Sequence, residues 1–253
     1  MTASDLKDNA YQTIDPESSL SVAQRLFHVT FKTSGVLYWI GGWLFLFGSI
    51  LFYPRYANIY DIPGEGALIG GWLFLFGCIM FQSGSLIEVW NARYAHKEGS
   101  DFNRFLPMMM AVSNVLGSVC FVYGGVYFLP KYYNENPSLG CYLFIAGCSI
   151  FSYAILVDVP RMIREKQAIF GLWTTCAVFN MVGNILFIVG SYYFLPKFLF
   201  VEDADLASSN LIYSTNYFVV GSVAFIIAPT AQVIALYKEV ASAPVAAALQ
   251  TQP

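Results

Sequence analysis

Charged side chains are scarce in this chain of 253 residues, at 11% of the sequence against roughly 25% in an average soluble domain. A soluble protein needs more charge to cover its surface, whereas 57% of these residues are hydrophobic. The composition therefore predicts an integral membrane protein. The small net charge of −3 and the lack of a basic run argue against nucleic acid as a partner.

The residue patterns of common catalytic and metal sites are also missing. The sequence has no Gly-x-Ser-x-Gly or P-loop motif and no His-x-x-x-His pair, and its two histidines, His28 and His96, are far apart. No two cysteines form a Cys-x-x-Cys motif, and all five lie in apolar stretches, where a thiol is typically a small buried group. These cysteines are Cys78, Cys120, Cys141, Cys148 and Cys176. We therefore expect no enzyme activity, no cofactor and no metal site.

Six long apolar stretches follow a polar start. They lie near residues 34–53, 67–90, 108–129, 139–159, 171–195 and 212–237. Each has about 20 residues or more, which is enough for a helix to cross a hydrocarbon core of roughly 30 Å. Strands of a transmembrane β-barrel are about half as long and alternate polar with apolar residues, which these stretches do not do. The sequence thus predicts an all-α protein with six transmembrane helices.

A motif at the end of the first, third and fifth stretches shows an internal repeat. It reads Gly, six residues, Gly, five residues, Pro, a basic residue and an aromatic residue, with Phe four residues after the first Gly and two before the Pro. Its copies span 41–56, 117–132 and 183–198. The even-numbered stretches repeat a Phe-x-x-Gly-(Cys/Ser)-x-x-Phe pattern from Phe74, Phe144 and Phe218. Because Pro cannot continue a helix without losing a backbone hydrogen bond, each motif is expected to end its span.

The repeat unit is therefore a helical hairpin of two spans. Hairpins are expected at residues 33–92, 108–160 and 171–238. Because each hairpin has an even number of spans, successive hairpins have the same orientation in the membrane. Three such tandem parallel repeats predict a six-helix bundle with pseudo-three-fold symmetry.

Basic residues lie mostly on one side of the predicted membrane. The side with both termini and the loops 91–107 and 160–170 carries Lys7, Arg25, Lys32, Arg93, Lys97, Arg104, Arg161, Arg164, Lys166 and Lys238. The other side carries only the motif residues Arg55, Lys131 and Lys197, which we interpret as interfacial anchors. By the positive-inside rule, both termini are expected in the cytoplasm.

Two terminal segments lie outside the predicted bundle. Residues 1–32 are polar and are expected to be cytoplasmic. Within them, residues 19–32 form either a short amphipathic helix on the membrane surface or a tail that becomes ordered only near the first span. Residues 239–253 are expected to form a disordered tail.

Small residues recur every seven positions in the even-numbered spans, as at Gly70, Gly77 and Gly84. Seven residues make two helical turns less about 20°, so each set lies on one helix face. Lipid gives helices little hydrophobic reason to associate, so such faces pack by close backbone contact. We expect packing within each hairpin, the alternative being a groove for a lipid or ligand. The expected packing positions are Gly41, Gly48, Gly77, Gly117, Gly124, Gly147, Gly183, Gly190 and Gly221.

Polar side chains recur at two equivalent positions within the spans. The first set is Tyr38, Asn114 and Asn180, and the second is Glu88, Asp158 and Gln232. Counted along the helices, both sets lie at similar depth near the inner side. We expect one polar pair per hairpin, or contact of the two carboxylates with interfacial water beside Arg93 or Arg161. The alternative is a polar ring around the axis that binds a cation, a proton or a polar headgroup.

The aromatic-glycine runs in the first hairpin resemble those of a known family. Residues 43–52 (WLFLFGSILF) and 71–77 (GWLFLFG) are similar to the YrhK-like family of small membrane proteins, which have paired apolar helices with a W-L-F-x-x-G-S-type core. The internal repeat extends the resemblance over about residues 34–240. Simple members have one hairpin, whereas this chain has three. The resemblance implies the paired-helix fold, but no established activity, substrate or catalytic residue.

The sequence favours a non-catalytic multi-pass membrane protein that acts by helix packing and by association with membrane lipids or proteins. It would work as a subunit of a larger assembly or by self-association. The alternative is a small transporter or channel with its polar site at Glu88, Asp158 and Gln232. Wide, water-accessible space between the repeats would favour the alternative, and a closed core of Phe and Gly would favour the first function.

Overall fold

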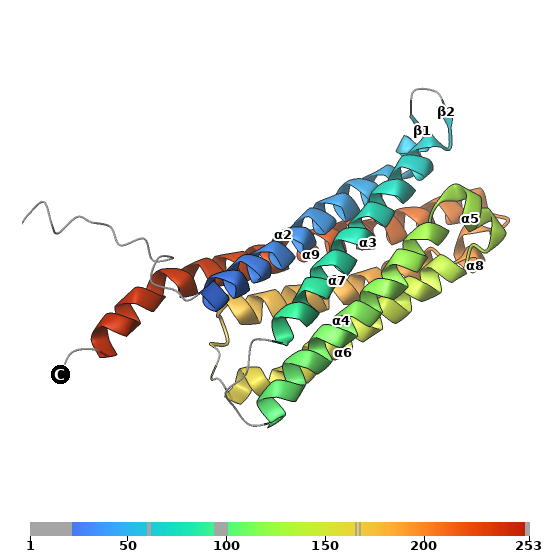
Figure 1. Cartoon of the computed structure of the whole chain (residues 1–253). Coiled ribbons are helices and arrows are strands. Elements are labelled where there is room, and N and C mark those ends of the chain that lie inside the picture. The colour runs from blue at the N-terminus through green and yellow to red at the C-terminus, as the bar shows by residue number, and fades with distance from the viewer. Residues whose placement is uncertain (1–21, 60–61, 94–100, 165, 167, 251–253) are drawn as a thin grey trace, which may run out of the picture.

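Six long helices lie side by side in the described part of the chain (Figure 1). The computed structural model describes residues 22–59, 62–93, 101–164, 166 and 168–250. The helices are α2 (Val22–Leu51), α3 (Glu65–Ala92), α4 (Asp101–Tyr127), α6 (Leu139–Arg164), α7 (Leu172–Tyr193) and α9 (Ala204–Gln250). Each contains a segment that is long and apolar enough to cross a membrane. The prediction of an all-α protein with six membrane spans is confirmed.

The helices form a closed ring in chain order. The most extensive packing is within the pairs α2–α3, α4–α6 and α7–α9. The pairs then meet through α3–α4, α6–α7 and α9–α2, so the second helix of each hairpin packs on the first helix of the next. This cyclic arrangement is the one that three parallel repeats predict, and its least extensive contact is α6–α7.

Each Pro motif ends a span at one end of the bundle, here called the proline end (Figure 1, right). The three prolines begin the short helices η2 (Pro54–Tyr56), α5 (Pro130–Glu135) and α8 (Pro196–Leu199). The residue before each Pro is extended, with ψ of 139, 135 and 145°, because Pro disfavours helical backbone in its predecessor. The short strands β1 (Asn58–Ile59) and β2 (Ile62–Pro63) pair in the first loop.

The basic residue of each motif lies over an aromatic ring at the proline end. Arg55 lies 4.7 Å from the ring centroid of Tyr56, Lys131 5.3 Å from Tyr132 and Lys197 4.3 Å from Tyr192. All three basic residues are exposed. A cation held against an exposed aromatic ring is the arrangement expected of an anchor at a membrane interface.

Twelve phenylalanines at the repeat positions fill the centre of the bundle. From the proline end they form four layers of three equivalent residues: Phe52, Phe128, Phe194; Phe74, Phe144, Phe218; Phe45, Phe121, Phe187; and Phe81, Phe151, Phe225. Each of these side chains is at most 8% exposed. Ring contacts join successive layers, for example from Phe52 to Phe74 at 5.2 Å and from Phe45 to Phe81 at 5.2 Å between centroids. The rings thus form a continuous column along the pseudo-three-fold axis.

The glycines of the two helix motifs make room for this column. At each of the nine packing positions, an added Cβ would lie 2.6–3.2 Å from a Phe ring of the other helix in the same hairpin. At Gly41, for example, the ring belongs to Phe81, and at Gly183 it belongs to Phe225. The glycine faces therefore lie inside the hairpins. The phenylalanine side chains pack over these faces and extend to the axis of the bundle.

Both ends of the described chain differ from the expectation. Helix α2 begins at Val22, so residues 22–32 are continuous with the helix of the first span, which begins at Lys32, and are not a separate surface helix. The Thr30 hydroxyl donates to Asn91 Oδ1 on α3 at 2.5 Å, which ties the end of this segment to the bundle. Helix α9 continues to Gln250 through most of the tail expected to be disordered, where alanine is frequent and favours helix. Residues 1–21 and 251–253 lie outside the described part.

Candidate functional site

A cavity of about 470 Å³ lies between the helices at the end opposite the prolines, here called the terminal end because α2 begins and α9 ends there (Figure 1). All six long helices contribute to its lining. Its floor contains Phe81, Phe151 and Phe225, which form the last layer of the phenylalanine column. The bundle is therefore hollow at one end and filled by aromatic rings at the other.

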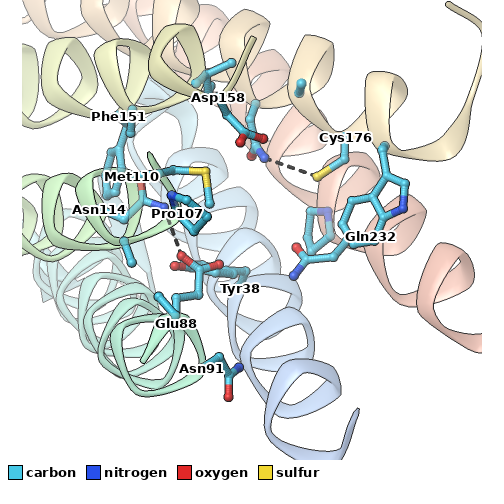
Figure 2. A pocket seen from close by; sticks show the side chains of 18 of the residues that line it. Tyr38, Glu88, Asn91, Pro107, Met110, Asn114, Phe151, Asp158, Cys176 and Gln232 are labelled. Atoms are coloured by element: carbon cyan, nitrogen blue, oxygen red, sulfur yellow. Dashed lines mark hydrogen bonds between the residues drawn. The ribbon is translucent and has the colours of Figure 1, made fainter. Parts of the chain in front are cut away.

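The six polar residues singled out by the repeat all line this cavity, together with residues that only the structure places there (Figure 2). They come from all three hairpins: Tyr38, Glu88, Asn114, Asp158, Asn180 and Gln232. The cavity thus brings both polar positions of all three hairpins together.

Glu88 joins the first hairpin to the second. Asn114 Nδ2 on α4 donates to Glu88 Oε2 on α3 at 2.9 Å (Figure 2). The Tyr38 hydroxyl is hydrogen-bonded to Ser85 Oγ at 3.0 Å, and its ring lies beside Glu88 in the cavity (Figure 2). Tyr38 and Glu88, the pair expected in the first hairpin, thus line the same cavity, but the hydrogen bond of Tyr38 goes to Ser85. The expected pairing of Asn114 with Asp158 is wrong, because Asn114 faces the neighbouring hairpin across α3–α4.

Asp158 is held within its own helix. Arg161 Nε donates to Asp158 Oδ1 at 2.6 Å, and Arg161 Nη2 donates to Asp158 Oδ2 at 2.7 Å. The side chains are 13% exposed for Asp158 and 28% for Arg161. The sequence analysis named Arg161 as one possible partner, and this bidentate pair is the arrangement that neutralises a carboxylate most effectively.

The third hairpin supplies amides whose hydrogen-bonding capacity is largely unused. Asn180 Nδ2 contacts Cys176 Sγ at 3.5 Å on the same helix, so the expected pair with Gln232 is not formed. Gln232 is 7% exposed, and its amide points into the cavity (Figure 2). Among the described residues it has no hydrogen-bond partner.

The cavity is also lined by two asparagines that the sequence analysis did not select. Asn184 is 1% exposed and its Oδ1 has no partner among the described residues. Asn91 is 3% exposed and its Nδ2 is likewise unpaired there. Comparison of the repeats missed Asn184 because Gly42 and Ser118 occupy its equivalent positions. A signal existed in its spacing, since it follows Asn180 by one helical turn on the same face.

The charges in the lining do not balance. The lining contains two carboxylates, Glu88 and Asp158, and one guanidinium, Arg161, which is paired with Asp158. In the described part of the chain no group of three or more His, Cys, Asp and Glu side chains is placed to hold a metal ion. The cavity thus has the parts of a binding site: mainly apolar walls, a few amides and one carboxylate that has no cationic partner among the described residues.

The sequence matches the family described as YrhK-like protein over residues 31–91, 104–159 and 171–236. Together these matches cover more than half of the chain. The chain belongs to the YrhK-like family. Each match contains one helical hairpin, so the protein has three YrhK-like units around a common axis, and each unit contributes to the cavity. Searches of the curated proteins and of the solved structures gave no match.

Proposed function

We propose that this YrhK-like protein is a non-catalytic membrane protein that binds an amphiphilic molecule, a lipid or a lipid-like compound, in the cavity at the terminal end. The observation that carries this proposal is the one-sided cavity, which is open space among all three hairpins and is closed by the phenylalanine column. A closed core favours binding over conduction, and the hollow end provides the place where a guest is held.

The walls of the cavity suit an amphiphile. Apolar side chains such as Met110, Ile155 and Leu236 make up much of the lining. A small number of polar groups lie among them, notably Glu88 and Gln232. A mainly apolar cavity of a few hundred Å³ with a few placed polar groups is typical of small-molecule sites. The apolar part of a guest would contact the walls while its polar part reaches these groups.

Catalysis is not favoured by the side chains that meet here. Among the described residues the lining has no serine or histidine, and its thiol, Cys176, is a buried residue beside Asn180. Nucleophilic catalysis needs a nucleophile with an adjacent base, and neither carboxylate lies in such a pair within the described residues. We therefore propose a binding role without chemistry.

Transport is the second candidate, because the six polar residues do come together in one place. It would require the four phenylalanine layers to part. Close contacts such as Gly41 with Phe81 hold each hairpin together, so movement would have to occur between hairpins, and α6–α7 is the least extensive of these interfaces. A flux of protons or cations into proteoliposomes, lost in Glu88→Gln and Asp158→Asn with folding intact, would support transport.

Native mass spectrometry of the protein released from mild detergent tests the binding proposal. We expect a bound lipid or lipid-like molecule on the parent protein. Ala177→Trp should remove it, because Ala177 lines the cavity and a Trp side chain would fill the space. Val178→Trp is the matched control, since Val178 is 52% exposed on the outer surface of α7.

Two outcomes would contradict the proposal: a parent protein without any bound amphiphile, or an Ala177→Trp variant that retains as much as the parent. The same spectra report the mass of the intact complex. They therefore also test whether the protein associates with itself or with another membrane protein, which we propose as a further property of its apolar outer surface.

A further inference from the structure

We infer that the molecule held in the cavity carries an organic ammonium group, as an amine or a quaternary ammonium, and that this group binds between Glu88 and the aromatic floor. The inference rests on the proposed binding function and specifies the chemical class of the ligand. It follows from the charge, the aromatic rings and the unpaired amides of the cavity, taken in turn.

The charged side chains in the lining indicate that the ligand is a cation. Arg161 neutralises Asp158 by two hydrogen bonds, so the remaining carboxylate of the lining is that of Glu88. Its hydrogen-bond partner in the described part of the chain is neutral, namely the amide of Asn114. A partly buried carboxylate with a neutral partner is stabilised further by a cation, and a cationic ligand would supply one.

Aromatic rings lie next to this carboxylate. Tyr38, which lies beside Glu88 in the cavity (Figure 2), packs edge-on against Phe81 of the floor with 5.0 Å between centroids. Phe151 and Phe225 complete the floor. An organic cation near such rings gains from their negative faces, and a desolvated site strengthens this attraction. A carboxylate beside several aromatic rings is thus suited to an ammonium group.

Unpaired amides indicate that the site is built for a guest. Gln232 is 7% exposed, has no partner among the described residues and points into the cavity (Figure 2). Buried polar groups are nearly always hydrogen-bonded, so an unpaired one in a cavity lining marks a place where a ligand or water binds. The amide oxygen of Gln232 accepts an N–H of an amine or an O–H of a hydroxylated ammonium compound.

Inorganic cations and anions fit less well. A divalent metal ion requires several oxygen ligands, and one of the two carboxylates is already tied to Arg161. An anion would be repelled by Glu88, and the nearest guanidinium is paired with Asp158. The mainly apolar walls favour an organic body over a hydrated ion.

Choline and its neutral carbon isostere, dimethylbutanol, provide a matched pair of probes. The thermal stability of the purified parent protein is measured in detergent against each probe and against sodium chloride at equal ionic strength. We expect choline to stabilise the protein, and dimethylbutanol to bind at least about tenfold more weakly. Equal stabilisation by the two compounds, or by choline and sodium, would overturn the inference.

Glu88→Gln removes the charge and keeps the shape and the hydrogen-bonding capacity of the side chain. We expect it to weaken choline binding by about tenfold or more. Glu135→Gln is the control, because Glu135 is exposed on α5 at the proline end. If Glu88→Gln fails to fold, the comparison of choline with dimethylbutanol on the parent protein still tests whether the site prefers an ammonium group.

An experiment in nanodiscs distinguishes the two possible sources of the ammonium group, a lipid headgroup and a free compound. The protein is placed in equal mixtures of phosphatidylcholine and phosphatidylglycerol, and the retained lipid is identified by native mass spectrometry. Retention of phosphatidylcholine by the parent and its loss in Glu88→Gln identify a lipid headgroup. Choline binding without lipid retention identifies a free compound. If both lipids are retained equally, the binding function stands and the ammonium inference fails; if neither probe nor lipid binds, both fail.

Discussion

Gly147 on α6 and Phe121 on α4 meet so closely that a Cβ at Gly147 would lie 2.6 Å from Phe121 Cδ1 and 2.8 Å from the carbonyl oxygen of Gly117. The missing side chain therefore has two effects. It lets the two backbones of the hairpin approach, and it lets the Phe121 ring cross α6 to reach the axis. The same contact builds the hairpin and the phenylalanine column.

Gly147→Leu should separate α4 from α6 and displace Phe121. Because the nearest atoms include backbone, the strain cannot be relieved by side-chain rotation alone, and the expected cost is roughly 1–3 kcal/mol. A fall in the midpoint of thermal unfolding in detergent measures it. Ala146→Leu, at an exposed neighbouring position, should leave the midpoint nearly unchanged. A Gly147→Leu variant as stable as Ala146→Leu would show that this face contacts lipid.

Asn114→Leu should weaken the contact between the first two hairpins. It removes the donor to Glu88, and an interhelical hydrogen bond in a membrane is worth roughly 0.6–2 kcal/mol. Asn180→Leu at the equivalent position in the third hairpin should cost less, because among the described residues Asn180 donates a hydrogen bond only to Cys176 of its own helix. Thermal unfolding of the two variants in the same detergent compares them. Equal losses would argue against the bond to Glu88.

Asp158→Asn should destabilise the protein, since it leaves Arg161 without its carboxylate at the cavity. Both side chains are partly exposed, so the expected cost is about 0.5–1 kcal/mol. Arg161→Gln should be destabilising as well, and the double variant should lose less than the sum of the two. The measurement is a double-mutant cycle on thermal unfolding. Strict additivity would show that the pair contributes nothing.

The sequence predicted most of the fold because its repeats are regular, but it predicted only part of the site. Phe45, Phe121 and Phe187 mark one layer of the column through their spacing alone. Depth along a helix, by contrast, does not tell which of its two neighbours a side chain faces. Asn114 lies at the depth of both Asp158 and Glu88. Because α4 also packs against α3, Asn114 can reach Glu88, and its hydrogen bond goes to that residue.

The orientation in the membrane remains a prediction from the charge asymmetry. Single cysteines at Asn134 and Gly99 test it with an impermeant thiol reagent on intact cells. Asn134 is exposed on α5 at the proline end and should react from outside. Gly99 belongs to the loop between the second and third spans and should react only after the membrane is opened. Labelling of Gly99 from outside would reverse the predicted orientation.

The variant Phe121→Ala tests whether the phenylalanine column only stabilises the bundle or also closes a path through it. Phe121 is fully buried and contacts Phe45, Phe144 and Phe151, so its loss opens space in the middle of the column and should cost about 3–5 kcal/mol. Thermal unfolding in detergent measures this loss. Phe76→Ala is the control, because Phe76 is 47% exposed and stacks on Trp72 at the outer surface. If the column only holds the helices together, Phe121→Ala lowers stability and leaves proteoliposomes sealed to protons and cations. A leak in Phe121→Ala that is absent from both the parent and Phe76→Ala would instead show that the column closes a path from the cavity to the proline end, and would favour transport over binding.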